Sequence, residues 1–243
     1  MNSQALKIIS IIAVVTLLSF WFWVAAEPWV HSETKFRDSS LWILPAIILV
    51  VLAASTAVAY MLLPQKRLKM LLAGLIAVTY VVVFGFGYPQ ILALFVILIL
   101  HVLAIRDIHL ESRERLKIHP GFIIRRGIAA IMIPLYIALS FAYFASPSIH
   151  ENVRTQQTAP TFKQAVQNYV IEQAYDQIMR QLAPYRAYFP PVLAFGLFLV
   201  LWGLGFVFHR VAAWLGMLIF WLLRKANFVA IQEMDVKAES MVL

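Results

Sequence analysis

The residues most able to do chemistry within apolar sequence are His209 and Arg210. They are adjacent and stand near the middle of FGLFLVLWGLGFVFHRVAAWLGMLIFWLLRK, residues 195–225. Ionisable residues inside membrane segments often line substrate or ion pathways. A long cationic side chain at the membrane boundary needs no such role, because it can reach the headgroups. Both interpretations of the pair are open on sequence alone.

The histidines also raise the question of metal binding. His101, Asp107 and His109 lie close in sequence, and His119 follows them. Positions 101 and 109 are about two turns of a helix apart, which is wide for ligands of one ion. The sequence therefore predicts neither a metal site nor a cofactor, and it favours a role for His101 in hydrogen bonding near the membrane interface.

Familiar catalytic motifs are not found in this sequence. It has no Gly-rich phosphate loop, no HExxH zinc motif and no GxSxG elbow. It has no cysteine, which excludes disulfides, thiolate metal sites and cysteine nucleophiles. Every Asp and Glu falls in an expected loop or tail, whereas proton-coupled carriers and intramembrane hydrolases usually hold an acid inside the bundle. The sequence favours a non-enzymatic role.

Composition defines the elements that must position these residues. Of the 243 residues, 62% are hydrophobic and 13% are charged, whereas soluble chains are about half apolar and a quarter charged. Apolar runs of about 18 residues or more recur, long enough to cross a bilayer as helices. The expected fold class is all-α, a polytopic membrane bundle of about six transmembrane helices plus one amphipathic helix in the last extracytoplasmic loop. The expected spans are 6–26, 41–63, 68–84, 89–105, 127–145 and 191–223.

The formal net charge of +8 comes mainly from Lys and Arg at the ends of the apolar runs. Such residues set topology and bind anionic lipid, so a bilayer is the expected partner and nucleic acid is not. Their distribution predicts that both termini are cytoplasmic, and the compact loops suit the plasma membrane of a bacterium. The alternative for residues 1–26 is a cleaved leader, although the apolar core of about 17 residues is longer than usual.

The loop 146–190 contains the clearest amphipathic pattern. TFKQ at 161–164 fits a capping box, and apolar residues then recur at three- and four-residue spacing. We expect a helix over 161–183 with a nearly neutral, Gln-rich polar face, which favours contact with protein over contact with lipid. The expected partner face, for another protein or a second copy, consists of Phe162, Val166, Tyr169, Val170, Ala174, Ile178 and Leu182.

The expected organisation has four parts. Residues 1–145 hold five membrane helices and a basic connector (106–126), in which Pro120 and Gly121 are expected to end any helix. The loop 146–190 follows, then the sixth span at 191–223 and a cytoplasmic tail at 224–243. As one helix the sixth span would be about 50 Å long, against a hydrocarbon core of ~30 Å. We therefore expect a break near 209–210 that places the cationic pair at the interface, with one long tilted helix as the alternative.

Two functional hypotheses follow from these patterns. The first is a non-enzymatic subunit or scaffold of a membrane assembly, supported by the amphipathic helix, the charged connector and the absence of acids from the spans. The second is a small transporter or channel subunit in which His209 and Arg210 line a polar path.

Labelling of single cysteines tests the predicted topology, since the chain has no native cysteine. We expect a membrane-impermeant thiol reagent to label His150→Cys only from outside the cell and Ala230→Cys only from inside. Labelling of both positions from the same side would contradict six crossings. The cysteine-free parent controls for background.

Overall fold

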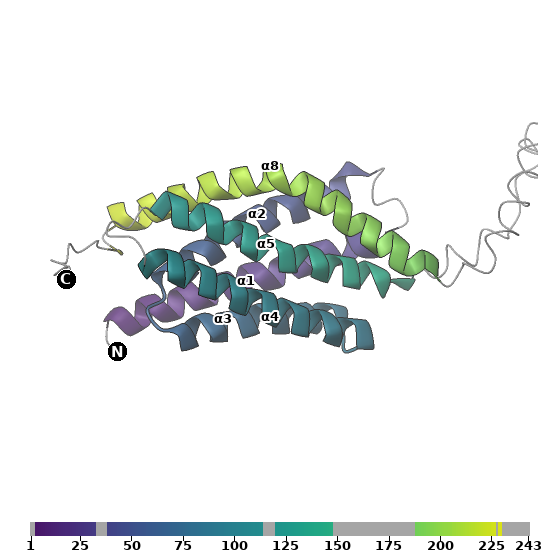
Figure 1. The fold of residues 1–243 in the computed structure, drawn as a ribbon, viewed down its shortest axis with the longest axis horizontal. Coiled ribbons are helices and arrows are strands. Elements are labelled where there is room, and N and C mark those ends of the chain that lie inside the picture. The colour runs from purple at the N-terminus through teal and green to yellow at the C-terminus, as the bar shows by residue number, and fades with distance from the viewer. Residues whose placement is uncertain (1–2, 33–37, 114–119, 148–187, 227, 230–243) are drawn as a thin grey trace, which may run out of the picture.

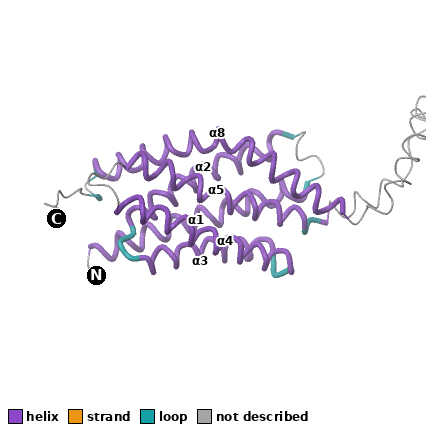
Figure 2. Tube along the Cα trace, in the orientation of Figure 1, coloured by secondary structure: helices purple, strands orange, loops and turns teal. Residues whose placement is uncertain are grey.

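The computed structural model describes residues 3–32, 38–113, 120–147, 188–226 and 228–229, and this described part consists of six helices with short turns at their ends (Figure 2). They are α1 (Ser3–His31), α2 (Ser39–Leu62), α3 (Lys66–Phe84), α4 (Tyr88–Arg113), α5 (Pro120–Phe144) and α8 (Phe189–Lys225). Each is long and apolar enough to cross a bilayer. The prediction of an all-α membrane bundle with six spans is confirmed.

The helices form a closed ring in the order α1, α2, α8, α5, α4 and α3, and α2 and α5 also meet across its middle. α1 begins and α8 ends at the same end of the bundle (Figure 1). There the Lys7 ammonium donates a hydrogen bond of 3.1 Å to the carbonyl of Phe228. We call this the inner end. Arg224 and Lys225 lie there at the end of α8.

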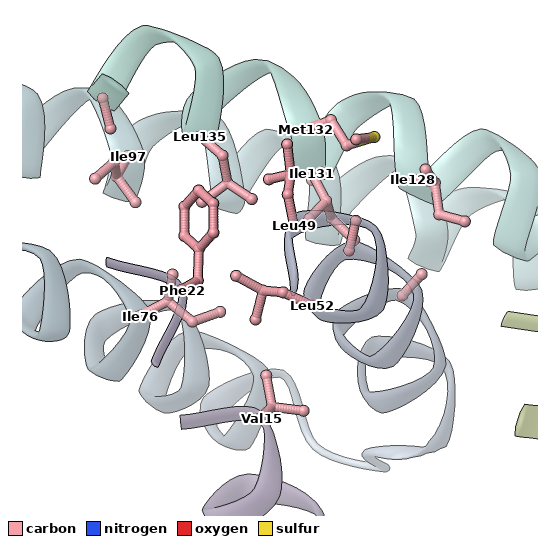
Figure 3. Close-up of a cluster of buried hydrophobic side chains, with 14 of the residues drawn as sticks. Val15, Phe22, Leu49, Leu52, Ile76, Ile97, Ile128, Ile131, Met132 and Leu135 are labelled. Atoms are coloured by element: carbon pink, nitrogen blue, oxygen red, sulfur yellow. The ribbon is translucent and has the colours of Figure 1, made fainter. Parts of the chain in front are cut away.

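Apolar side chains fill the centre of the ring. Large buried residues from α1 to α5 meet there, including Phe22, Leu52, Ile76, Ile97 and Leu135 (Figure 3). In a bilayer, lipid tails are as apolar as these side chains, so close packing and interhelical hydrogen bonds hold helices together. The ring order is therefore set by shape complementarity between helices.

One buried hydrogen bond links α1 to α3. The Ser19 and Thr79 hydroxyls are 2.8 Å apart, and Thr79 Oγ1 donates to the carbonyl of Ile76, also at 2.8 Å. Because the Thr79 proton is used in that bond, Ser19 is the donor to Thr79. Interhelical bonds of this kind contribute about 0.6 kcal/mol on average in membranes. This pair helps to fix the register of two helices that run in the same direction.

A tight turn joins α3 to α4, in the gap between the expected spans 68–84 and 89–105. Gly85 ends α3 at φ +85°, a left-handed conformation that glycine adopts without strain, and its amide donates to the carbonyl of Val81 at 2.8 Å. Pro89 lies in the first turn of α4, where its missing amide proton leaves no helical bond unmade.

α2 begins after a capping residue that the sequence supplies. Asp38 has extended backbone angles, and its carboxylate accepts hydrogen bonds from the backbone amide and the hydroxyl of Ser40. Both bonds hold the pKa of the Asp38 carboxyl below its usual value, and the bond from the Ser40 hydroxyl has the larger effect.

Three helices extend beyond the apolar runs that predict them. α1 continues to His31, α4 reaches Arg113, and α5 begins at Pro120. Hydropathy falls where charged residues enter the sequence, but one face of each extension stays apolar and packed. Trp29 and Ile108 are buried in two of them, and Ile123 is buried in the third. Pro120 starts a helix rather than ending one, which suits its fixed φ.

The expected break in the sixth span is not found. α8 is one continuous helix of 37 residues, about 55 Å long, and it arches over the bundle (Figure 1). The expected division rested on the mismatch between a helix of about 50 Å and a hydrocarbon core of ~30 Å. In the structure α8 stays packed on its neighbours before and after Arg210, through Gly205 and Gly216, and the helix continues. Arg210 is exposed beside this contact, in a groove between α5 and α8.

Small residues let α8 approach α5 and α2 closely. A Cβ at Gly216 would lie 2.8 Å from Ile124 Cγ2 of α5 and 3.7 Å from the Ala54 carbonyl of α2. A Cβ at Gly205 would lie 3.1 Å from the ring of Tyr136. The side of α8 that carries these glycines is its contact surface, and each contact needs the absence of a side chain.

This contact predicts a difference between two glycines of the same helix. Gly216→Leu should destabilise the protein by about 1–3 kcal/mol because the new side chain overlaps Ile124. Gly203→Leu is the matched control, since nothing lies within 4 Å of a Cβ there. Thermal unfolding in detergent measures the difference, and equal midpoints for the two variants would refute the contact.

Candidate functional site

The predicted pair, His209 and Arg210, occupies two different environments. The Arg210 guanidinium carbon lies 4.9 Å from the centre of the Phe206 ring, one turn earlier on α8. Arg210 also lines a groove of about 290 Å³ between α5 and α8, which Phe122, Arg125 and Trp214 line as well. Arg210 therefore faces away from the interior of the ring.

The packing of α8 on α5 sets the depth of Arg210. The two helices run in opposite directions, with Gly216 against Ile124 and Gly205 against Tyr136. Arg210 lies between these two levels. Its groove also holds Arg125, which belongs to the second turn of α5, close to the inner end. Arg210 is therefore level with the middle turns of α5, and α8 continues for about four turns beyond it.

His209 lies on the bundle side of α8. It is half-buried, and its ring centre is 6.4 Å from that of Tyr136. Its buried Nε2 makes no hydrogen bond, and the Tyr136 hydroxyl donates only to the sulfur of Met132, at 3.8 Å. The pair therefore does not act as one unit, because the imidazole and the guanidinium project to different sides of α8.

His101 is fully buried between α4 and α2. Its Nδ1 lies 2.9 Å from the carbonyl of Ile97, so Nδ1 carries the proton and Nε2 presents a lone pair. The ring meets Tyr60 edge-on, with centres 6.2 Å apart. Neither His101 Nε2 nor the Tyr60 hydroxyl has a hydrogen-bond partner. An acceptor and a donor thus lie on neighbouring helices inside the bundle.

The structure does not bring the other histidines of this region into a ligand set. Within the described residues, no three His, Asp or Glu side chains are placed to hold an ion. The side chains of Asp107 and His109, and all of His119, lie outside what the structure describes. The expected partner face from Phe162 to Leu182 also lies outside the described residues and stays a prediction.

A second hollow of about 240 Å³ lies among α1, α2, α5 and α8. Its lining is formed by apolar side chains, among them Phe22, Trp29, Trp42, Leu49, Leu201 and Phe208. Trp42 is exposed at its rim. A solute path needs polar groups along its wall, and this hollow offers apolar ones.

Sequence patterns missed the partners of both candidate residues. Arg125 and Trp214 share the groove with Arg210, and Tyr60 meets His101. On sequence alone Arg125 is one of several basic residues in the connector 106–126. These contacts depend on the register between helices that are distant in sequence, and no motif within either helix reports that register.

A ladder of cysteines along one face of α8 tests the depth of Arg210. Gly203→Cys, Arg210→Cys and Met217→Cys are spaced by seven residues, about 10 Å per step. We expect an impermeant thiol reagent applied from the inner side to label positions 217 and 210 but not 203, which should lie in hydrocarbon. Labelling at 203 would instead indicate a water-filled path along α8. Protection of both 210 and 203 would place Arg210 in hydrocarbon.

The chain was compared with family models, curated proteins and solved structures. None of these comparisons found a match. The fold class therefore rests on the six apolar helices themselves, and function has to be argued from where the side chains lie.

Proposed function

We propose that this chain is a non-enzymatic subunit or scaffold of a membrane assembly, and that α8 carries a surface on which a second membrane-embedded chain packs. The observation that carries the proposal is the part of α8 that follows Arg210. It continues for about four turns to Lys225 with one side packed on α2 and α5. Its other side exposes Val211, Leu218 and Leu222, each about half exposed.

These three residues form a stripe along the helix. Their spacing of seven and then four residues places them on one face of α8. Gly216 and Ala212 occupy the packed face, and Arg210 lies to one side. We call Val211, Leu218 and Leu222 the α8 stripe. It is separate from the groove that Arg210 and Arg125 line.

The length of α8 argues that lipid alone does not cover its apolar surface. Large exposed apolar side chains extend from Val192 to Leu222, about 45 Å along the axis. At an average tilt of about 20° this surface still spans roughly 42 Å, against a hydrocarbon core of ~30 Å. About 10 Å of apolar helix therefore leaves the hydrocarbon, and a contiguous apolar patch there is typical of a protein contact.

The transporter hypothesis receives less support from the same side chains. It requires Arg210 to face a polar path, whereas Arg210 is on the exposed side of α8 and packs against Phe206. The buried side chains described in the ring are mainly apolar. An assembly role needs no path through the bundle.

The orientation belongs to the same proposal. Lys7 and the basic end of α8 gather at the inner end of the bundle. Positive residues favour the cytoplasmic side. We therefore place the inner end, with both termini, in the cytoplasm, and the protein in the plasma membrane of a bacterial cell. The α8 stripe then meets its partner close to the cytoplasmic boundary, and the predicted helix 161–183 offers a second contact outside.

Site-specific photo-crosslinking in native membranes tests the α8 stripe. A benzophenone amino acid at Leu218 or Val211 should give a protein adduct of one discrete mass, because a packed partner presents the same atoms each time. Val78 of α3 and Phe95 of α4 are matched controls, since both are about half exposed. There we expect lipid adducts only.

The adduct at Leu218 should also depend on the apolar side chains of the α8 stripe. Leu222→Lys should sharply reduce the adduct at Leu218, because a cation in the interface must be desolvated. Two differently tagged copies in one cell show whether the partner is a second copy. The same adducts at all four positions, or an adduct that survives Leu222→Lys, would overturn the proposal.

Deleting 161–182 tests the predicted outer contact separately. We expect the shortened protein to insert and fold but to lose the partner or the self-association seen by cross-linking and co-purification. If association is unchanged, the outer helix has no part in the assembly. The photo-crosslinking experiment tests the α8 stripe independently of this deletion.

A further inference from the structure

We propose that the groove between α5 and α8 at the inner end binds one anionic phospholipid, with the lipid phosphate between Arg125 and Arg210. Both arginines are exposed and line this groove of about 290 Å³. The inference is independent of the α8 stripe, because the groove lies on the α5 side of Arg210 and uses other residues.

Charge complementarity is the first support. Arg125 and Arg210 line the groove, and no acidic side chain of the described residues does. Among the described residues the ion pair that the structure shows joins Glu27 to His31, at the opposite end of α1. Like charges in one groove repel, so an anion that both can contact relieves that repulsion. Guanidinium groups suit phosphate because their planar donors can bind two oxygens at once.

The walls of the groove supply the second support. Phe122 and Trp214 are exposed, Trp214 by 74%, and Met217 Sδ would lie 3.0 Å from a Cβ at Gly121. Tryptophan favours the headgroup level of a bilayer. A soluble phosphate would gain nothing from these apolar walls, whereas the glycerol and upper acyl carbons of a lipid would be covered by them.

The surface beyond Arg210 supplies the third support. Phe206 lies directly against the guanidinium on the side toward the middle of the bilayer, and it is 63% exposed. One turn further, Gly203 has nothing within 4 Å of where a Cβ would be. A lipid whose phosphate lies between the arginines would extend its acyl chains along this apolar surface. The order of charge, ring and open helix surface matches the order of phosphate, glycerol and chain in a phospholipid.

Native mass spectrometry of the purified full chain, titrated with phosphatidylglycerol or phosphatidylcholine, measures this site. We expect the first phosphatidylglycerol to bind more tightly than phosphatidylcholine. The double variant Arg125→Gln/Arg210→Gln should weaken that binding roughly thirtyfold, since each basic residue near the membrane surface contributes about fivefold. Arg67→Gln/Arg224→Gln is the matched control, because it removes the same charge from exposed inner-end residues outside the groove.

Two further measurements separate the effect of charge from that of guanidinium geometry, and a lipid site from a site for free phosphate. Arg125→Lys/Arg210→Lys keeps both charges but loses the planar donors, so it should bind phosphatidylglycerol more tightly than the glutamine pair and less tightly than the native protein. Inorganic phosphate should not compete, because it lacks the part of the lipid that the apolar walls cover. Equal binding of phosphatidylcholine, equal loss in the control pair, or effective competition by phosphate would overturn the assignment.

Discussion

The contact of α8 with α5 and α2 through small residues is the constraint on which the rest of this structure depends. Gly205 and Gly216 allow backbones and aromatic rings to approach within van der Waals distance. Ala212 and Ala213 are buried on the same side. Because α8 packs through small residues on both sides of Arg210 along its axis, the helix stays continuous past that charge. The continuity of α8 and the outward position of Arg210 are thus one result.

The length of α8 matters for function because it exceeds the thickness of the hydrocarbon core. A helix of about 55 Å cannot lie wholly within a hydrocarbon core of ~30 Å at ordinary tilt. Arg210 and Arg125 line one groove along the seam of α5 and α8, and α8 continues for about four apolar turns after Arg210. The exposed apolar side chains of these turns must be buried by lipid or by protein. We propose a protein partner on the α8 stripe and a phospholipid in the groove between α5 and α8.

The interior of the ring shows how polar groups are accommodated without a polar path. Ser19 and Thr79 satisfy each other and a backbone carbonyl, and this links α1 to α3. His101 uses one nitrogen in the same way, and its second nitrogen faces the edge of the Tyr60 ring. In hydrocarbon an unpaired polar group costs several kcal/mol. The described part of the ring still holds buried polar atoms without a hydrogen-bond partner, among them those of Trp23, Thr56 and Tyr80.

The sequence by itself determined the six apolar helices of the described residues, because only helices satisfy the backbone in lipid and the apolar runs have the length of a bilayer. The gap between the expected spans 68–84 and 89–105 also located the turn at Gly85. The sequence was wrong about the division of α8, because the length of an apolar run does not report how the helix packs on its neighbours. Only the tertiary structure decided that packing, and only the antiparallel register of α5 and α8 brought Arg125 into the groove with Arg210. Contacts between distant helices depend on shape and register, which no local pattern of residue types contains.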